Sequence, residues 1–330
     1  VDLRGRVAVV TGGRIKIGHA IARRLLDWGA RVVVTTRFPS DAARRFAAAP
    51  DFADFADRLE IYGLDLRDLP ALEGFCAGLL AKHPRIDALV NNAAQTIRRP
   101  PAFYAELFAL EEAGAAALPP AARALLPPPL AERRAAPAGA GGLALRDAAA
   151  LFPAGSDDGF GQPEDHRPTN SWRLRLDEVS TIELVETQLI NVAAPFVLSA
   201  RLRRAMARAD AADDGAFIVQ VAAPEGQFYR HYKAPFHPHT NMAKAALNML
   251  TRTSAEDYAG DRIFMTSVDT GWASNENPRP IAEAMRARGF TPPLDMIDAA
   301  TRVCDPIARG LGDGEFLFGV LLKDFRPIPW

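Results

Sequence analysis

Cysteine is scarce in this sequence: its 330 residues include only Cys76 and Cys304. Two cysteines so far apart in the chain support neither a disulfide framework nor a cysteine-ligated metal cluster. The default location for such a chain is a reducing compartment, so we expect a cytoplasmic protein.

An excess of charge is also lacking. Lysine and arginine total 39, aspartate and glutamate total 40, and the formal net charge is -1. This balance gives no electrostatic reason to expect nucleic acid or an anionic membrane as a partner. No uninterrupted apolar run approaches the roughly 20 residues of a membrane span. The first apolar strand begins by about Val7, so we expect no signal peptide.

The first ninety residues contain an alternation of strand-like and helix-like patterns. Apolar, β-branched runs are typical of buried parallel strands, and the segments between them have helical spacing. Repeated β-α-β units predict a parallel sheet with helices on both faces. The predicted strands are 6–11, 31–37, 59–66 and 86–94, and the predicted helices are 17–30, a segment that begins near Pro39, and 69–83.

Alanine and proline interrupt this pattern between about residues 100 and 170. Structureless loops of this length are uncommon inside compact domains, so we treat 96–175 as an insertion after strand four of one domain, 1–330. It is either an elaborated surface insertion with short helices or a lid or partner surface near the active site. Because its composition offers little apolar core, we expect residues 115–165 to be dispensable for folding but not for function.

Regular patterning returns after the insertion. We predict a long helix over 176–209 with a kink at Pro195. The remaining predicted elements are a strand at 216–223, a helix at 238–259, a strand at 262–269 and a seventh strand within 316–325. The predicted fold is α/β, a doubly wound parallel sheet with a large insertion after strand four.

A glycine-bearing turn, TGGRIKIG at 11–18, joins the first strand to the first helix. Backbone N–H groups in such a turn approach a pyrophosphate closely, and the helix N-terminus favours its negative charge. The position of the turn predicts a dinucleotide site.

This turn, LDLRD at 64–68, NNAA at 91–94, Asn191 and Lys244 resemble the short-chain dehydrogenase/reductase superfamily in order and setting. The resemblance covers about 1–95 and 178–275. It implies a Rossmann domain that binds NAD or NADP. The family turn is usually TGxxxGxG, and Lys16 replaces its middle glycine here, similar to the TGxxxRxG turn of the NADPH-dependent pteridine reductases.

The residues after the second strand favour NADP over NAD. An NAD binder usually places an acid there, whereas this chain has Thr35, Thr36 and Arg37. Arginine can form paired hydrogen bonds with a 2′-phosphate that a carboxylate would repel, although Arg37 could also be a solvated residue at a strand end. With the positions that the resemblance adds, the predicted cofactor-binding residues are Gly12, Arg14, Lys16, Ile17, Gly18, Arg37, Asp65, Leu66, Asn92, Ala93, Lys244 and Gly271.

The resemblance also implies a catalytic set of serine, tyrosine, lysine and asparagine, of which two members are missing. Lys244 and Asn191 match, but Thr240 stands at the tyrosine position and Ala222 or Ala223 at the serine position. A phenol titrates near 10 and can be tuned by a neighbouring lysine, whereas an aliphatic hydroxyl is a poor proton donor. Carbonyl reduction without a substitute acid should therefore be slow.

The segment before Lys244 offers substitutes. His237 lies seven residues before the lysine, the spacing of the tyrosine in enoyl-acyl-carrier-protein reductases, and a histidine is a competent acid near neutral pH. Alternatively, the aromatic and histidine residues of this segment only pack the loop or cap the helix. A zinc site of His231, His237 and His239 lacks an acidic ligand, so we predict no metal. The predicted catalytic residues are Lys244, Asn191, Thr240, His237, Tyr229 and Tyr232.

After strand six, Gly271 matches a family glycine, and Ser274 or Asn275 could take the place of the family threonine. Trp272 either walls the substrate pocket or covers the end of the sheet. The leading functional prediction is an NADP(H)-dependent oxidoreductase with a non-standard proton donor, acting on a small organic molecule, in a homo-oligomer (dimer or tetramer). The alternatives are a non-redox enzyme (cyclase, lyase or isomerase) and a cofactor-binding pseudoenzyme or binding module.

Overall fold

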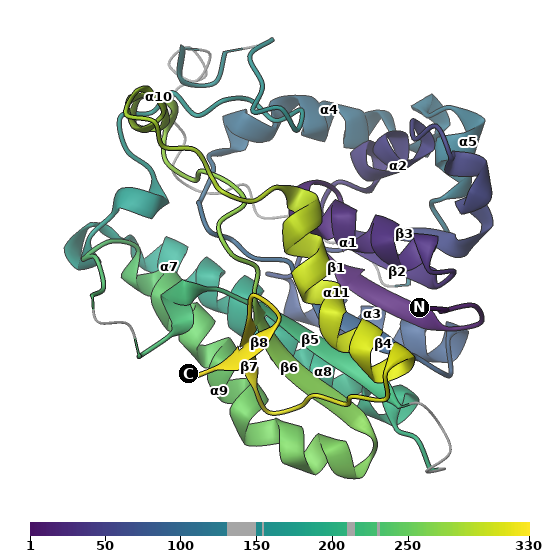
Figure 1. Cartoon of the computed structure of the whole chain (residues 1–330). Helices are drawn as coiled ribbons and strands as arrows, with labels where there is room; N and C mark the ends of the chain where they lie inside the picture. The colour runs from purple at the N-terminus through teal and green to yellow at the C-terminus, as the bar shows by residue number, and fades with distance from the viewer. Residues whose placement is uncertain (131–149, 154, 210–214, 230–231) are drawn as a thin grey trace.

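An eight-stranded sheet forms the centre of the molecule in the computed structural model, which describes residues 1–130, 150–153, 155–209, 215–229 and 232–330. The strand order is β3-β2-β1-β4-β5-β6-β7-β8, and every neighbouring pair is parallel except β7 and β8. This order confirms the predicted doubly wound sheet (Figure 1). The strands are β1 Val7–Thr11, β2 Arg31–Thr36, β3 Leu59–Gly63, β4 Ala88–Asn91, β5 Ala216–Ala222, β6 Ile263–Asp269, β7 Leu321–Lys323 and β8 Arg326–Ile328.

Helices cover both faces of the sheet because alternate residues of each strand are apolar on both faces. In β1, Ala8 and Val10 belong to one core cluster and Val9 to the other. The first cluster includes α1 (Lys16–Asp27), α2 (Pro39–Ala47) and α11 (Met296–Gly312). The second includes α3 (Leu69–Lys82), α8 (Ala194–Met206) and α9 (Pro238–Gly260).

The helix predicted over 176–209 is three consecutive segments. These are α7 (Thr181–Gln188), a π-turn at Leu189–Ala193, and α8. Pro195 has no N–H to donate to the carbonyl of Asn191, so the helix widens one turn before the proline. Among the described residues, Thr181–Met206 is long and apolar enough to cross a membrane by length and composition alone, and here it packs along α3 and the sheet.

The described parts of the insertion contribute to the core, so the expectation that they add little to it was wrong for residues 115–130. Leu118, Ala122 and Leu125 are at most 3% exposed and belong to the first core cluster. The backbone N–H of Ile61 in β3 donates to the carbonyl of Leu125 at 2.9 Å. The short helices α4 (Ala105–Ala113) and α5 (Pro120–Ala124) both pack against α2, as Figure 1 shows.

The C-terminal region departs most from prediction. The helices α10 (Arg279–Ala287) and α11 were not predicted, and the strand expected within 316–325 is the shorter β7, followed by the antiparallel β8. The helix α11 packs along α1 and against β5 and β6. The loop between β6 and α10, residues 270–278, crosses the carboxyl ends of the parallel strands and reaches the candidate site.

Candidate active site

The glycine turn and the end of β4 are joined by hydrogen bonds. The Oγ1 atom of Thr11 accepts from the backbone N–H groups of Asn92 and Ala93, both at 3.0 Å. Gly12 has φ +70°, and a Cβ there would lie 3.0 Å from the Cα of Ala93, so this position favours glycine. Lys16, where the family pattern has glycine, has a left-handed φ of +53°.

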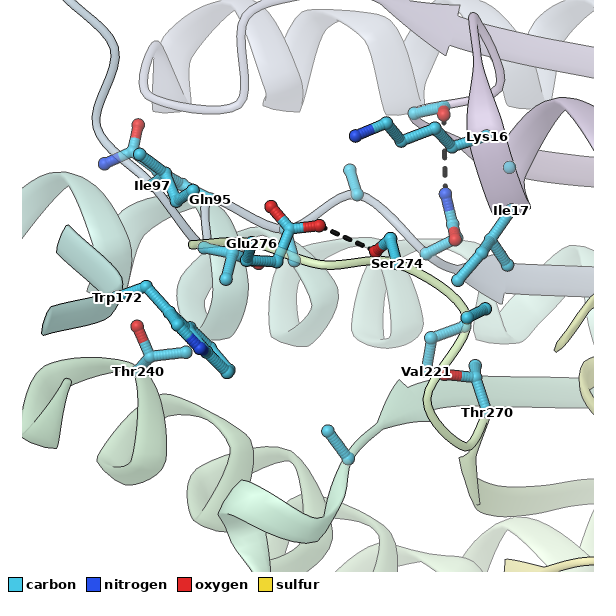
Figure 2. Close-up of a pocket in the computed structure, with 18 of the residues that line it drawn as sticks. Lys16, Ile17, Gln95, Ile97, Trp172, Val221, Thr240, Thr270, Ser274 and Glu276 are labelled. Carbon is cyan, nitrogen blue, oxygen red and sulfur yellow. Dashed lines mark hydrogen bonds between the residues drawn. The ribbon is translucent and has the colours of Figure 1, made fainter. Parts of the chain in front are cut away.

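A cavity of about 1070 Å³ lies at the carboxyl ends of the parallel strands, where open α/β sheets bind ligands. Every residue of the predicted cofactor-binding set lines this cavity, and so do Lys244, Thr240 and His237 of the predicted catalytic set. Figure 2 shows Lys16 and Ile17 at one side of the cavity and Trp172 and Thr240 at another, with Ser274 and Glu276 reaching in from the loop after β6.

Basic side chains at the glycine turn already have acidic partners. Arg14 is buried and donates to Asp41 at 2.7 Å, and also to the side chain of Gln162 at 3.0 Å. Burial lowers the pKa of Arg14, while Asp41 opposes the shift. Lys16 forms an ion pair with Asp158 at 3.2 Å. Part of the described insertion, residues 158–162, therefore lies against the turn.

Arg37 follows the end of β2, and Asp65 lies just after the end of β3. The guanidinium of Arg37 lies over the ring of Tyr104, 4.8 Å from its centroid. Asp65 accepts paired hydrogen bonds from Arg67 at 3.0 and 2.6 Å. Burial would raise the pKa of Asp65, but the hydrogen bonds from Arg67 hold it below its usual value.

Lys244 is a buried ammonium group on α9. Its side chain is 7% exposed, and Nζ donates to the carbonyl of Val221 at 2.6 Å. Burial lowers the pKa of Lys244 to about 8, although Glu225 and Asp269 act in the opposite direction. This group therefore titrates close to neutral pH, where proton transfer is efficient.

Asn191 holds a segment of the cavity wall by two hydrogen bonds to the backbone of Gln95. Its side chain accepts from the backbone N–H of Gln95 at 2.7 Å and donates to the carbonyl of Gln95 at 3.2 Å. Gln95 lines the cavity, so the π-turn positions Asn191 to fix the segment that follows β4. π-Turns inside helices are frequent at functional sites.

The positions of the missing serine and tyrosine also face the cavity. Ala222 and Ala223 line it, and neither supplies a hydroxyl. Thr240 is 2% exposed, and its hydroxyl has no hydrogen-bond partner among the described residues. An unsatisfied buried hydroxyl costs free energy, and a bound molecule could provide its partner.

His237 lines the cavity, and a hydrogen bond determines which of its ring nitrogens carries the hydrogen. Its ring stacks on Trp172 with centroids 3.8 Å apart and an interplanar angle of 6°. Nδ1 lies 2.8 Å from the carbonyl of Trp172 and must carry the hydrogen of this bond. Burial lowers the pKa of His237 below 6.5, so at neutral pH Nε2 bears a lone pair and is suited to accept a proton.

The other tyrosine and histidine candidates of the loop are not placed at the cavity. Tyr229 and Tyr232 are 78% and 76% exposed and do not line it, so their catalytic role stays a prediction. His239 is buried 3.5 Å from Glu183, and His231 lies outside the described residues. Within the described part of the chain, no three His, Cys, Asp or Glu side chains are arranged to hold a metal ion.

Three acidic residues of the cavity were missed by the sequence analysis, Glu225, Glu276 and Asp324. Glu276 is half-buried, and its carboxylate accepts from the hydroxyl of Ser274 at 2.7 Å. Burial would raise the pKa of Glu276, but Lys16, Ser274 and Arg99 bring it below its usual value. Figure 2 shows this carboxylate projecting into the cavity. The sequence signal that could have identified Glu276 is an acidic residue among the polar residues that follow strand six.

Comparisons with known proteins agree with this geometry. The short chain dehydrogenase family matches residues 6–107. An uncharacterized protein of Acanthamoeba polyphaga mimivirus is 32% identical over 321 residues, which is 93% of this chain and 63% of that protein. Dehydrogenase/reductase SDR family member 13 of Homo sapiens is 39% identical over 94 residues, 28% of this chain and 24% of that protein.

A solved structure extends the likeness to the whole fold. The short-chain dehydrogenase from Burkholderia cenocepacia in complex with NADP has a TM-score of 0.62 at 20% identity, covering 98% of this chain and 97% of that one. Residues 6–107 thus match the short chain dehydrogenase family, and the whole chain has the fold of a short-chain dehydrogenase. It spans less than two thirds of the length of the mimivirus and human relatives, so their activities do not define its own.

Proposed function

We propose that this protein is an NADP(H)-dependent oxidoreductase of short-chain type with a non-standard proton donor, acting on a small organic molecule. The observation that carries the proposal is Lys244, a buried ammonium group in the same cavity as the whole predicted cofactor-binding set. A cavity of about 1070 Å³ has room for a ligand, whereas a filled site would favour a scaffold protein.

The residues present fit a dinucleotide. The Gly12 turn lets the backbone approach a pyrophosphate, and Asn92 and Ala93 would lie beside the adenosine ribose. Lys244 would hold the ribose next to the nicotinamide, which when bound supplies or accepts a hydride. Arg37 would meet a 2′-phosphate, and the NADP in the Burkholderia structure supports this choice.

The proton donor is the least standard part of the site. The Thr240 hydroxyl is too weak an acid, and His237 is oriented to accept a proton. Lys244 has a suitable pKa of about 8 but donates its hydrogen bond to Val221. A non-redox enzyme is the second candidate, favoured by Ala222, Ala223 and Thr240 at the serine and tyrosine positions.

A fluorescence titration with NADPH and NADH tests the proposal. We predict that NADPH binds about tenfold tighter or more, and that Arg37→Ala removes this preference, because paired charge-assisted hydrogen bonds to the phosphate are lost. Arg173→Ala is the matched control, since this cavity arginine lies over Phe236 and should leave the preference unchanged. Equal affinities in the wild type would overturn the choice of NADP, and absence of binding would overturn the oxidoreductase.

We also propose a cytoplasmic homo-oligomer. Both cysteines are free and buried. Exposed apolar side chains gather on neighbouring helices α7, α8 and α9, where a second copy could cover them. They are Ile182, Val185, Phe196, Met242 and Met249.

A further inference from the structure

We propose that the substrate carries its own positive charge, as an iminium ion, and that Glu276 and Glu225 provide its counter-charge. The inference rests on the proposed function and names the substrate class of the same site. It accounts together for two observations: the cavity lacks the serine and tyrosine hydroxyls of the family pattern, and two of its carboxylates form no ion pair with a described basic residue.

The two carboxylates differ from the other acids of the cavity. Asp65 is paired with Arg67 at 2.6 Å, and Asp324 with Arg302 at 3.1 Å. No basic group of the described residues lies within 4.0 Å of the carboxylate of Glu225 or Glu276, although both line the cavity. These two acids are therefore available to a cation that enters it.

Three bases that line the cavity are engaged with other acids. Lys16 pairs with Asp158, Arg99 with Asp165, and Lys323 with Asp269. These bases still influence Glu276 over longer distances, since Lys16 and Arg99 both lower its pKa. Glu276 therefore remains a carboxylate through the neutral range, which a counter-ion for a cation requires.

An aromatic side chain and an unpartnered hydroxyl complete the recognition. Trp172, stacked on His237, lines the cavity and offers a π-face to a cation. Thr240 lines the cavity, and its hydroxyl has no hydrogen-bond partner among the described residues. Phenol and serine hydroxyls would serve a carbonyl oxygen, whereas this cavity presents acceptors.

The chemistry removes the need for the missing tyrosine. A carbonyl that receives a hydride becomes an alkoxide, which requires a proton. An iminium ion that receives a hydride at carbon passes its C=N π pair to nitrogen and becomes a neutral amine. A reduced nicotinamide held beside Lys244 would supply the hydride and leave as its cationic form, so charge would be conserved and no proton transferred. Thr240 and two alanines are then compatible with turnover.

Calorimetric binding to the cofactor-free protein tests the recognition without relying on turnover. The probes are N-methyl-3,4-dihydroisoquinolinium, a permanent iminium ion, and α-tetralone, a neutral ketone of similar shape. We expect the iminium ion to bind about tenfold tighter or more, Glu276→Gln to weaken it by about tenfold, and Glu225→Gln to weaken it less. α-Tetralone should bind the variants as it binds the wild type. Glu106→Gln, an exposed acid outside the cavity, is the matched control.

The outcomes separate this inference from the proposed function. Equal binding of the two probes, no binding of either, or unchanged iminium affinity in both Glu variants would overturn the charged substrate. If NADPH still binds in an Arg37-dependent manner, the proposed function stands without the charged substrate. Selective iminium binding by a protein that does not bind NADPH would support cation recognition and overturn the oxidoreductase. Oxidation of NADPH by the iminium ion, and not by α-tetralone, would support both.

Discussion

The charge on Lys244 links the candidate site to the stability of the fold. Its pKa is lowered by burial from 10.5 to about 8, so the unfolded chain binds its proton more tightly than the folded chain does. Below pH 8 the lysine is protonated in both the folded and the unfolded state. The whole cost of burying its charge then lowers the free energy of unfolding. This cost is relieved as the pH rises from about 8 to 10.5.

We predict that Lys244→Met raises the free energy of unfolding of the cofactor-free protein at pH 7. At roughly 1.4 kcal/mol per pKa unit, burial of the charge costs about 3 kcal/mol, and loss of the hydrogen bond to Val221 offsets about 1 kcal/mol. The net gain of about 2 kcal/mol should shrink towards pH 10. Urea unfolding at pH 7 and pH 9.5 measures both values.

Lys82→Met is the control of opposite sign. Its ammonium donates to Glu60 at 2.9 Å and to Tyr62 at 3.0 Å, and its pKa is raised, so its removal should lower the free energy of unfolding. A destabilised Lys244→Met protein at both pH values would show that the ammonium is favourable where it lies.

Single residues were predictable where the backbone itself demands them. Gly12 and Lys244 could be found because a strand-turn-helix and a helix face restrict which residues fit there. Glu276 could not, because its place in the cavity depends on how the loop after β6 folds. The role of His237 depends on a hydrogen bond to Trp172, 65 residues away in the sequence.

At the scale of elements, prediction succeeded for segments with a strong period and failed where tertiary contacts decide. The kink at Pro195 was expected, and the proline explains the π-turn one turn earlier. The helix α11 was missed although Asp295 and Asp298 form a capping box at its start. Pro306 lies inside this helix, and an interior proline usually argues against one.

The contribution of the insertion to the core can also be tested at the scale of elements. Leu125 is 1% exposed in the core between α5 and the sheet, so Leu125→Ala should lower the free energy of unfolding by about 2–4 kcal/mol. Chemical unfolding of the purified variant measures this change. The matched control is Leu176→Ala, because Leu176 is 76% exposed and its truncation should change the stability by less than about 0.5 kcal/mol. Equal effects of the two would restore the view that residues 115–130 are dispensable.

For the whole molecule, the doubly wound parallel sheet followed from the β-α-β repeats, since right-handed crossovers leave few arrangements. That arrangement places the strand ends, and therefore the cavity, on one edge. The packing of residues 158–162 against the glycine turn could not be predicted, because it joins Asp158 to Lys16 across 142 residues of alanine-rich and mixed sequence.

For the whole molecule, we predict that copies of this chain assemble into a homo-oligomer. Phe196 on α8 and Met249 on α9 are each 57% exposed, so we expect the wild type to be a dimer or tetramer and Phe196→Asp/Met249→Asp to be a monomer. Light scattering after size exclusion measures the mass. Ile297→Asp, at a 61% exposed position on α11, should keep the wild-type mass. A monomeric wild type, or an unchanged double variant, would contradict the proposed interface.

The two borders of the sheet limit how this protein can aggregate. The outer strand β3 already gives an N–H of Ile61 to the carbonyl of Leu125. At the opposite border, β8 contains Pro327, which has no N–H to offer to an incoming strand. Neither border is a ready template for intermolecular β-pairing, so concentrated solutions of the folded protein should resist fibril formation. Fibril growth should then require prior release of residues 115–130 from β3.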